Sequence, residues 1–477
     1  MQTIHLLTFI GYFSIIISVV FFTLKKQKSE NDFVLGDRGL NFWLTALSAH
    51  ASDMSQWLFI GLPATIFTQG VFGIWIAIGL TLFMFVNWQY IAPKLRTITE
   101  QSNSLTLNAY FENRFADKSG IIRLISAFMT LIFFTIYISS GLQAMGMITE
   151  SLFNVPYELG ITLGLLLVTF YVFIGGYSTV AWIDLFQGFF LLGVIVFIPC
   201  TLLLQIGGFT PIMEKIGSLG LSTSLFPDFS VNTIFKVVAL MLGWGLGYLG
   251  QPHILTKFMG IKKVEEMTKS KYIGLSWQIL ALGAASMIGL IGIYLFSGNL
   301  ADPESLIISI ANQYLSPFVV GLVLCAILAA VTNVMAAQIL VVASSLSEDF
   351  YKRWINRDAE SKTLLKASRL SVIGVSLLAF IIAIFKTSTI YKLVLFSWAG
   401  IGGSFGPLVL ASLYSDKINR FGAISGILTG GLVALFWPIV FSELPQEYTI
   451  IPAFVVSLST IFAVSKITTE KGLKYET

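Results

Sequence analysis

The sequence predicts an all-α membrane protein, and three observations support this fold class. Of its 477 residues, 56% are hydrophobic and only 11% are charged, far from the composition of a soluble globular domain. About 13 stretches stay apolar for roughly 20 residues, the length that a helix needs to cross a bilayer. When these stretches are threaded as alternating crossings, all but four of the 29 Lys and Arg residues fall on one side. We therefore expect a single transmembrane domain over residues 1–477.

The expected helices follow one another along the whole chain, and no domain linker separates them. They cover about 4–24, 42–67, 71–92, 121–149, 157–175, 179–206, 230–252, 272–297, 314–346, 367–386, 389–413, 421–441 and 449–466. The side with few basic residues holds only Lys215, Lys236, Lys386 and Lys392. Because Lys and Arg are enriched on the cytoplasmic side of membrane proteins, that side is expected outside. The N-terminus is then outside (periplasmic), the C-terminus is cytoplasmic, and the inner loop 94–120 is expected to include a surface helix.

Residues 50–57 place an ionisable side chain in the middle of the second expected helix. Asp53 stands there among polar neighbours, and Gly61 and Pro63 follow closely. A charged side chain at the centre of a bilayer costs about 2.5–3.5 kcal/mol on insertion scales and usually marks a functional site. The alternative is a carboxylate that caps a helix or reaches the interface, but Asp is too short to reach the interface from mid-membrane.

Residues 243–252 form a second unusual stretch, because glycines and Pro252 interrupt the seventh expected helix. Gly and Pro cost about 1 and 3 kcal/mol in a helix interior, so such a cluster predicts unwinding. Counted from the second helix, both stretches open groups of five helices that enter from opposite sides of the membrane. Broken helices at matching places of an inverted repeat indicate the binding site of a secondary transporter. The residues alone thus predict a carrier for a small, carboxylate-bearing solute and leave coupling to a cation open.

Nine segments together resemble the sodium/solute symporter family, and within it the bacterial sodium/proline symporters. They are 35–38, 46–57, 61–63, 133–137, 175–184, 243–253, 344–351, 398–400 and 405–407. The resemblance implies a leucine-transporter-like core of two five-helix repeats, at about 42–206 and 230–413. One helix (4–24) precedes this core, and two (421–466) follow it. It also implies sodium-driven uptake by a multi-pass protein of the cell inner (plasma) membrane.

The resemblance further implies a sodium site between the first break and a helix of the second repeat. The matching backbone carbonyls are those of Ala51, Met54 and Ala330, with Asp53 as the nearby acid. Where the family usually has a pair of hydroxyl side chains, this chain has Asn333 and Val334. The amide oxygen of Asn333 can bind sodium, whereas Val334 offers no oxygen. Sodium is therefore the expected coupling ion, and a proton-coupled or uncoupled carrier is the open alternative.

For the substrate, the resemblance to proline carriers suggests an aromatic site at the two breaks. The candidates are Ser55, Trp57, Gly61, Tyr137, Trp244 and Tyr248. An apolar pyrrolidine ring suits aromatic walls, and its ammonium suits carbonyls or a ring face. Each aromatic residue alone is equally compatible with helix packing. Arg38 is a candidate gating residue or a plain cytoplasmic anchor, and Asp184 is a candidate gating or proton-linked acid.

Other classes of function receive little support from the residues. A membrane sensor would need an output domain, and only about ten residues follow the last expected helix. An enzyme is not expected, because the chain has three histidines and no metalloprotease or nucleophile–base motif. We expect a small-molecule substrate, contact with membrane lipid, no nucleic-acid partner and function as a monomer.

Overall fold

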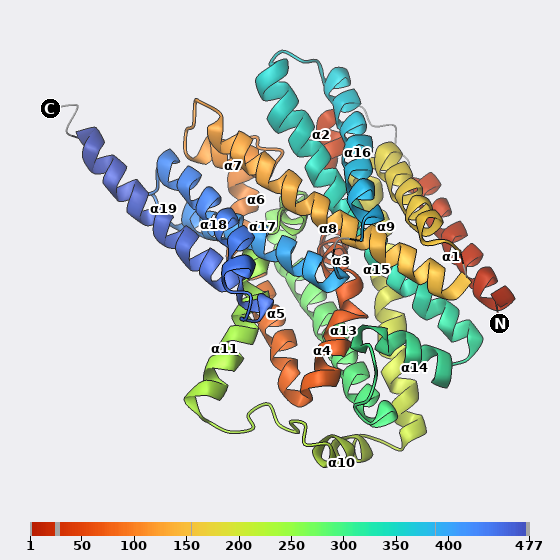
Figure 1. Ribbon diagram of the computed structural model, residues 1–477. Helices are drawn as coiled ribbons and strands as arrows, with labels where there is room; N and C mark the ends of the chain where they lie inside the picture. The colour runs from red at the N-terminus through yellow and green to blue at the C-terminus, as the bar shows by residue number, and fades with distance from the viewer. Residues whose placement is uncertain (1, 24–28, 154, 387, 474–477) are drawn as a thin grey trace.

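The computed structural model describes residues 2–23, 29–153, 155–386 and 388–473, and within these residues it contains helices and no strand (Figure 1). Leu24, the last residue of the first expected helix, lies outside the described residues. The α-helices are α1 (Gln2–Thr23), α2 (Glu30–Leu35), α3 (Phe42–Met54), α4 (Gly61–Gln69), α5 (Trp75–Val86), α6 (Ala92–Gln101), α7 (Leu107–Arg114), α8 (Ile121–Phe153), α9 (Tyr157–Ile206), α10 (Thr210–Ser218), α11 (Val231–Gly245), α12 (Pro252–Met259), α13 (Met267–Phe296), α14 (Leu306–Tyr314), α15 (Pro317–Ser344), α16 (Ser361–Ile384), α17 (Ile390–Tyr414), α18 (Arg420–Val440) and α19 (Ile450–Leu473).

Ten helical spans in the described part of the chain are long and apolar enough to cross a membrane. The other expected crossings are α1, the pair α3 and α4, and one half of α9. Helix α9 has 50 residues but is interrupted at Gly176, whose φ of 57° and ψ of −160° are not helical. An unbroken helix of that length would extend about 75 Å, far beyond a hydrocarbon core of about 30 Å. The multi-pass architecture is confirmed, and the exact number of crossings stays a prediction.

Several helices extend beyond the expected apolar stretches. Helix α13 begins at Met267 and α16 at Ser361, each before its expected start, because a helix continues through polar residues once it leaves the bilayer. Helix α7 forms in the inner loop where a surface helix was expected, but that expectation is wrong, because residues 107–112 are buried where α7 packs against α8. The short helices α2, α10 and α14 are not predicted by an apolar stretch of membrane length.

Helices α15 and α17 form the centre of the molecule. In their most apolar stretches, 83% and 89% of the residues are buried, against 33% for α16, α18 and α19. Helix α15 packs against α1, α3, α8, α9 and α16, and α17 packs against α8, α18, α19 and the interruption that follows α11. The two stretches that were expected to unwind therefore each adjoin a central helix: α3 packs against α15, and the segment after α11 packs against α17.

Candidate functional site

The first predicted break is present between α3 and α4. Helix α3 ends at Met54, and Ser55 has a positive φ of 43° with a ψ of −169°. A 3₁₀ turn, η2 (Gln56–Leu58), follows before α4 begins at Gly61. The last four carbonyls of a helix have no donor within that helix. The carbonyls of Ala51 and Met54, the expected sodium ligands, belong to this group.

The second predicted break is present between α11 and α12. The chain leaves α11 through a 3₁₀ segment, η5 (Leu246–Gly250), and through Gln251, which is extended. Gly247 lies so close to the indole of Trp398 on α17 that a Cβ atom there would collide with it. Trp398 Nε1 also donates to the Trp244 carbonyl at 3.0 Å. The glycines of this stretch thus serve close packing against α17 as well as unwinding.

A hydrogen bond joins the two breaks directly. The Tyr248 hydroxyl donates to Asp53 Oδ2 at 2.5 Å, and both side chains are buried. Gln278 Nε2 donates to the same hydroxyl at 3.4 Å, and Asn87 Nδ2 donates to the Tyr248 carbonyl at 2.9 Å. No Lys, Arg or His side chain of the described residues forms an ion pair with Asp53. Asp53 is therefore a buried acid with a neutral partner.

The predicted aromatic residues surround one small cavity between the breaks. It is lined by Asp53, Met54, Ser55, Trp57, Leu80, Tyr137, Trp244, Tyr248, Val394 and Trp398. The Trp57 and Trp244 rings lie 4.6 Å apart, and Trp398 meets Tyr248 edge to face at 5.4 Å. The cavity measures about 20 Å³, enough for a water molecule but far too small for an amino acid. The structure thus shows the site in a contracted state.

Not every candidate lies in the cavity wall, and some wall residues were not predicted. Gly61 supports the site from behind, since a Cβ atom there would lie 2.5 Å from Trp57 Cδ1. Trp398 belongs to one of the segments that resemble the symporter family, and this resemblance could have marked it as a site residue. Leu80 and Val394 are ordinary apolar residues of membrane helices, and nothing in the sequence marks them.

The residues expected to hold sodium combine carbonyls at the end of α3 and within α15 with an unpartnered amide. Both side-chain polar atoms of Asn333 are buried without a hydrogen-bond partner, and α15 packs against both α3 and η2. Val334 is buried and offers no oxygen. The Thr332 hydroxyl is already engaged, because it contacts the Ala329 carbonyl and accepts from Gln187. Carbonyl and amide oxygens suit a monovalent cation, so these residues fit sodium through Asn333 rather than through hydroxyls.

The two candidate gating residues have different surroundings. Asp184 Oδ2 accepts hydrogen bonds from Ser48 Oγ at 2.5 Å and from Lys257 Nζ at 2.8 Å. Arg38 forms no ion pair within the described residues. Its guanidinium donates instead to the carbonyls of Met259, Thr99 and Ser104 at 2.7–3.0 Å. Arg38 thus joins the ends of α12 and α6, and its role in gating stays a prediction.

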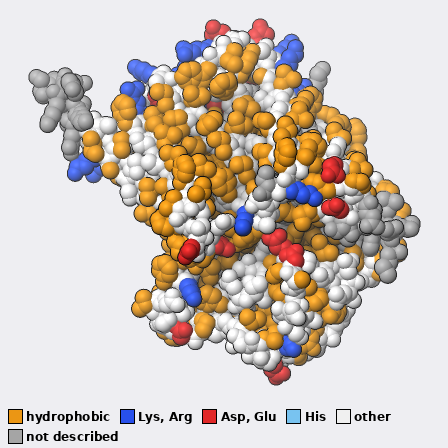
Figure 2. All heavy atoms as spheres, viewed as in Figure 1, with side chains coloured by type: hydrophobic (Ala, Val, Ile, Leu, Met, Phe, Trp, Pro, Cys, Tyr) orange, Lys and Arg blue, Asp and Glu red, His pale blue; other side chains and the backbone are white. Residues whose placement is uncertain are grey.

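On one side the site adjoins a large vestibule. This hollow of about 890 Å³ is lined by α4, by α8, by the segment before α14, by Lys386 and by residues 388–391. Figure 2 shows a hollow near the centre of the face, with acidic and basic side chains around it. Glu304 lies in its wall, and partial burial together with the nearby Asp302 raises the pKa of Glu304. Trp57, Tyr391 and Val394 line the constriction between this vestibule and the site.

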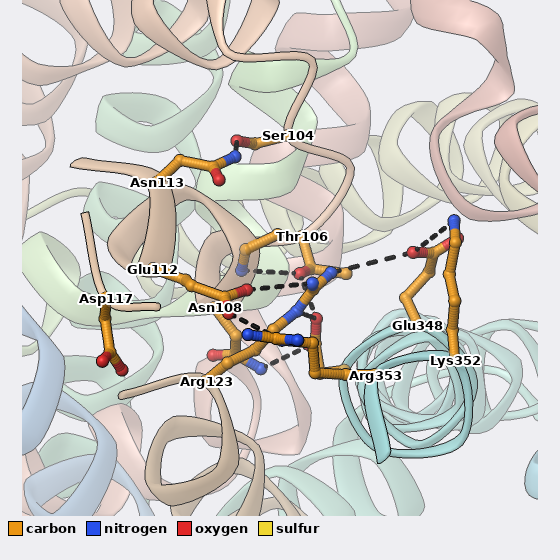
Figure 3. A network of polar contacts seen from close by, with 12 residues as sticks. Ser104, Thr106, Asn108, Glu112, Asn113, Asp117, Arg123, Glu348, Lys352 and Arg353 are labelled. Carbon is orange, nitrogen blue, oxygen red and sulfur yellow. Dashed lines mark hydrogen bonds and ion pairs between the residues drawn. The ribbon is translucent and has the colours of Figure 1, made fainter. Parts of the chain in front are cut away.

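On the opposite side, charged residues close the protein (Figure 3). Arg123 at the start of α8 contacts Glu112 on α7 at 3.0 Å and Asp349 at 2.6 Å. Asp349 belongs to a π-helical segment, η8 (Ser345–Ile355), that continues α15. Arg353 in the same segment also contacts Glu112, at 2.8 Å. A nearby cavity, which Ser344 lines, measures only about 20 Å³.

Comparison with known proteins shows close relatives over almost the whole chain. The model of the sodium:solute symporter family matches residues 33–430. The high-affinity proline transporter PutP of Bacillus subtilis (strain 168) is 38% identical over 453 residues, which are 94% of this chain and 95% of that protein. A sodium/proline symporter of Staphylococcus aureus (strain JH9) is 38% identical over 481 residues, which are 98% of this chain and 93% of that protein.

Solved structures share the fold at low sequence identity. The substrate-bound outward-open state of a Na⁺-coupled sialic acid symporter matches with a TM-score of 0.82 at 17% identity, covering 97% of this chain and 98% of that chain. MhsT in complex with L-phenylalanine matches with a TM-score of 0.57 at 13% identity, covering 89% of this chain and 98% of that chain. The expected all-α, leucine-transporter-like fold class is confirmed. With a family model that spans most of its length and relatives that match it nearly end to end, the protein belongs to the sodium:solute symporter family.

Proposed function

We propose that this protein imports L-proline together with sodium ions by alternating access. The observation that carries the proposal is the Tyr248–Asp53 hydrogen bond, which joins the two broken helices inside an aromatic cavity. Relatives that are 38% identical over nearly their full length are named as proline transporters or sodium/proline symporters. Transport without any enzymatic reaction is part of the same proposal.

The cavity has the chemistry that a proline zwitterion requires. The rings of Trp57, Trp244 and Tyr137 offer apolar faces to the pyrrolidine ring and a negative ring face to the ammonium. The start of α4 at Gly61 lies behind Trp57 and is proposed to offer backbone N–H groups to the carboxylate once the rings have separated. Ser55 and Tyr248 add hydroxyls at the two breaks. Because the cavity now holds only about 20 Å³, the rings must separate to admit proline.

Sodium is proposed to bind beside the substrate, at the end of α3. Its ligands are the carbonyls of Ala51, Met54 and Ala330 and the amide oxygen of Asn333, with Asp53 as the nearby negative charge. The cation drives accumulation only if it favours the state that binds proline well. A ligand shared between α3 and α15 couples the ion to the first break, because the cation holds those two helices together.

Uptake into proteoliposomes tests this proposal. An imposed inward sodium gradient should accelerate labelled proline uptake, and Asp53→Asn should reduce it by at least about 100-fold, the effect of losing a buried charge interaction. Asn333→Ser combined with Val334→Thr should lower the sodium concentration needed for half-maximal uptake. Proline uptake that ignores the sodium gradient would refute sodium coupling, and no proline uptake in any gradient would refute the substrate.

The second candidate is a proton-coupled or uncoupled carrier of proline or another small carboxylate solute. It is favoured by Val334, which removes an oxygen from the expected ion site. Uptake driven by a proton gradient alone, together with competition by other carboxylates, would establish it. We further propose that the protein works as a monomer in the cell inner (plasma) membrane, in contact with lipid and with no nucleic-acid partner. The N-terminus is proposed outside and the C-terminus in the cytoplasm, although residues 1 and 474–477 lie outside the described residues.

A further inference from the structure

We propose that Lys257 acts as a built-in cation that neutralises Asp184, so that each transport cycle carries a single mobile cation, the one at the first break. The proposal rests on the function proposed above. Its physical basis is that a buried carboxylate inside a membrane needs a positive partner, either from the protein or from water.

The two acids near the breaks obtain that partner in different ways. Asp53 accepts a hydrogen bond from the neutral Tyr248 and forms no ion pair in the described part of the chain. Asp184 is paired with the Lys257 ammonium at 2.8 Å, and the two side chains are only 1% and 2% exposed. The charge of Asp53 therefore calls for an ion from solution, whereas the charge of Asp184 is already balanced.

The surroundings of Lys257 hold its ammonium at Asp184. Lys257 is on α12, directly after the second break, and its Nζ lies 5.1 Å from the centre of the Tyr177 ring. The Tyr177 hydroxyl donates to the Thr256 carbonyl at 2.9 Å, which fixes that ring beside the lysine. A cation over an aromatic face is further stabilised when it is desolvated. The ammonium thus occupies a defined position rather than a loose one.

Removal of this ammonium would leave oxygens grouped around its position. Asp184 Oδ2 also contacts Ser48 Oγ at 2.5 Å, and Asp184 Oδ1 is buried without a hydrogen-bond partner. Carboxylate and hydroxyl oxygens are suitable ligands for sodium. The pair also connects α3, α9 and α12, so an ion taking its place would sit between both repeats. We therefore expect Lys257→Met to gain a second mobile cation.

The experiment measures the charge carried per proline from the reversal potential of uptake in proteoliposomes. Proline is a neutral zwitterion, so the charge equals the number of cations carried. The unmodified protein should carry about one charge per proline and Lys257→Met about two, and the sodium dependence of Lys257→Met should become sigmoidal. The double variant Asp184→Asn/Lys257→Met should return to about one charge, because neither buried charge remains. The control Lys271→Met should not change the charge, since the buried Lys271 contacts the neutral Gln89 at 2.6 Å.

Thermal unfolding provides a readout that does not depend on transport. Sodium should stabilise Lys257→Met more than it stabilises the unmodified protein or the double variant. If Lys257→Met does not fold, recovery of folding in the double variant supports the proposal that Lys257 balances the charge of Asp184. If the double variant also fails to fold, the proposal is overturned. Active Lys257→Met that still carries one charge also overturns the proposal, as does an unmodified protein that carries two. If protons drive uptake instead, the proposed sodium coupling fails. The charge carried per proline by Lys257→Met still tests whether Lys257 takes the place of a second mobile cation.

Discussion

Figure 1 shows α4 and α14 toward one end of the molecule and α2 and α7 toward the other. Near α4 and α14 the protein contains a vestibule, whereas near α7 charged side chains pack together with little exposure. The vestibule measures about 890 Å³, and an ion pair beside it, Lys386–Glu150, has a separation of 3.9 Å with both side chains about half exposed. On the opposite side, Arg123 contacts Asp349 at 2.6 Å with little exposure of either (Figure 3).

The difference shows where this state of the molecule is held closed. Exposed ion pairs contribute about 0–1 kcal/mol, whereas breaking a buried pair by removing one partner costs about 3–5 kcal/mol. An opening on this opposite side must first separate α7 and α8 from η8, where these buried contacts lie. On the vestibule side, Trp57, Tyr391 and Val394 line the constriction that leads to the site. The buried contacts of α7, α8 and η8 thus hold their side of the molecule closed.

The largest expected effect is a contrast in accessibility between the two sides. In a Cys200→Ser background, Thr68→Cys in the vestibule should react with a maleimide about 100-fold faster than Ser344→Cys in the small cavity beside η8, because the latter must wait for local opening. The measurement is the labelling rate in detergent, where reagent reaches both sides. Equal labelling rates would show that the side of α7 and η8 is not closed. The remaining Cys325 is buried. Its own labelling rate is measured in the Cys200→Ser parent, which has neither new cysteine.

Next in size is the effect of Arg123→Ala. It leaves Asp349 and Glu112 without their shared guanidinium, so unfolding should become easier by about 3 kcal/mol. Labelling of Ser344→Cys should become faster in the same variant. Arg123→Lys is the matched control, because it keeps the charge and should retain part of the stability. Unchanged stability and labelling in Arg123→Ala would show that the contacts of Arg123 do not hold the side of α7 and η8 closed.

A smaller effect is expected from pH, through the buried Glu30 of α2. Burial and the neighbouring Glu348 raise the pKa of Glu30 to about 8. Folded Glu30 therefore keeps its proton to higher pH than unfolded Glu30, so this stabilisation is full below the ordinary glutamate pKa and is lost as pH rises through about 8. The unfolding temperature should fall by a few degrees between about pH 6 and 9, and Glu30→Gln should reduce that fall. An identical pH profile in Glu30→Gln would contradict this assignment.

The smallest effect is expected on the vestibule side. Lys386→Ala removes the long, half-exposed pair with Glu150 and should change the free energy of unfolding by less than about 1 kcal/mol. Labelling of Thr68→Cys should also stay the same, since the vestibule is already open. If Lys386→Ala destabilised the protein as much as Arg123→Ala, the ion pairs on the two sides would contribute equally to stability.

Much of the fold and part of the site follow from local sequence. Apolar length predicts the helices, and the polar stretch around Asp53 and the glycines before Pro252 predict where two of them unwind. Five of the predicted substrate residues, Ser55, Trp57, Tyr137, Trp244 and Tyr248, line one cavity. These features are predictable because the cost of a polar group in lipid, or of glycine in a helix, depends on a few neighbouring residues.

Tertiary structure alone decided which side chains meet. Asp53 pairs with Tyr248, Asp184 pairs with Lys257, and Leu80 and Val394 complete a cavity that their own surroundings in the sequence do not indicate. Arg38 likewise meets carbonyls instead of an acid. Such contacts depend on how each helix is rotated and crossed against helices that are distant along the chain. Local composition determines where the helices unwind, whereas helix packing determines which side chain becomes the partner of each buried acid near these breaks.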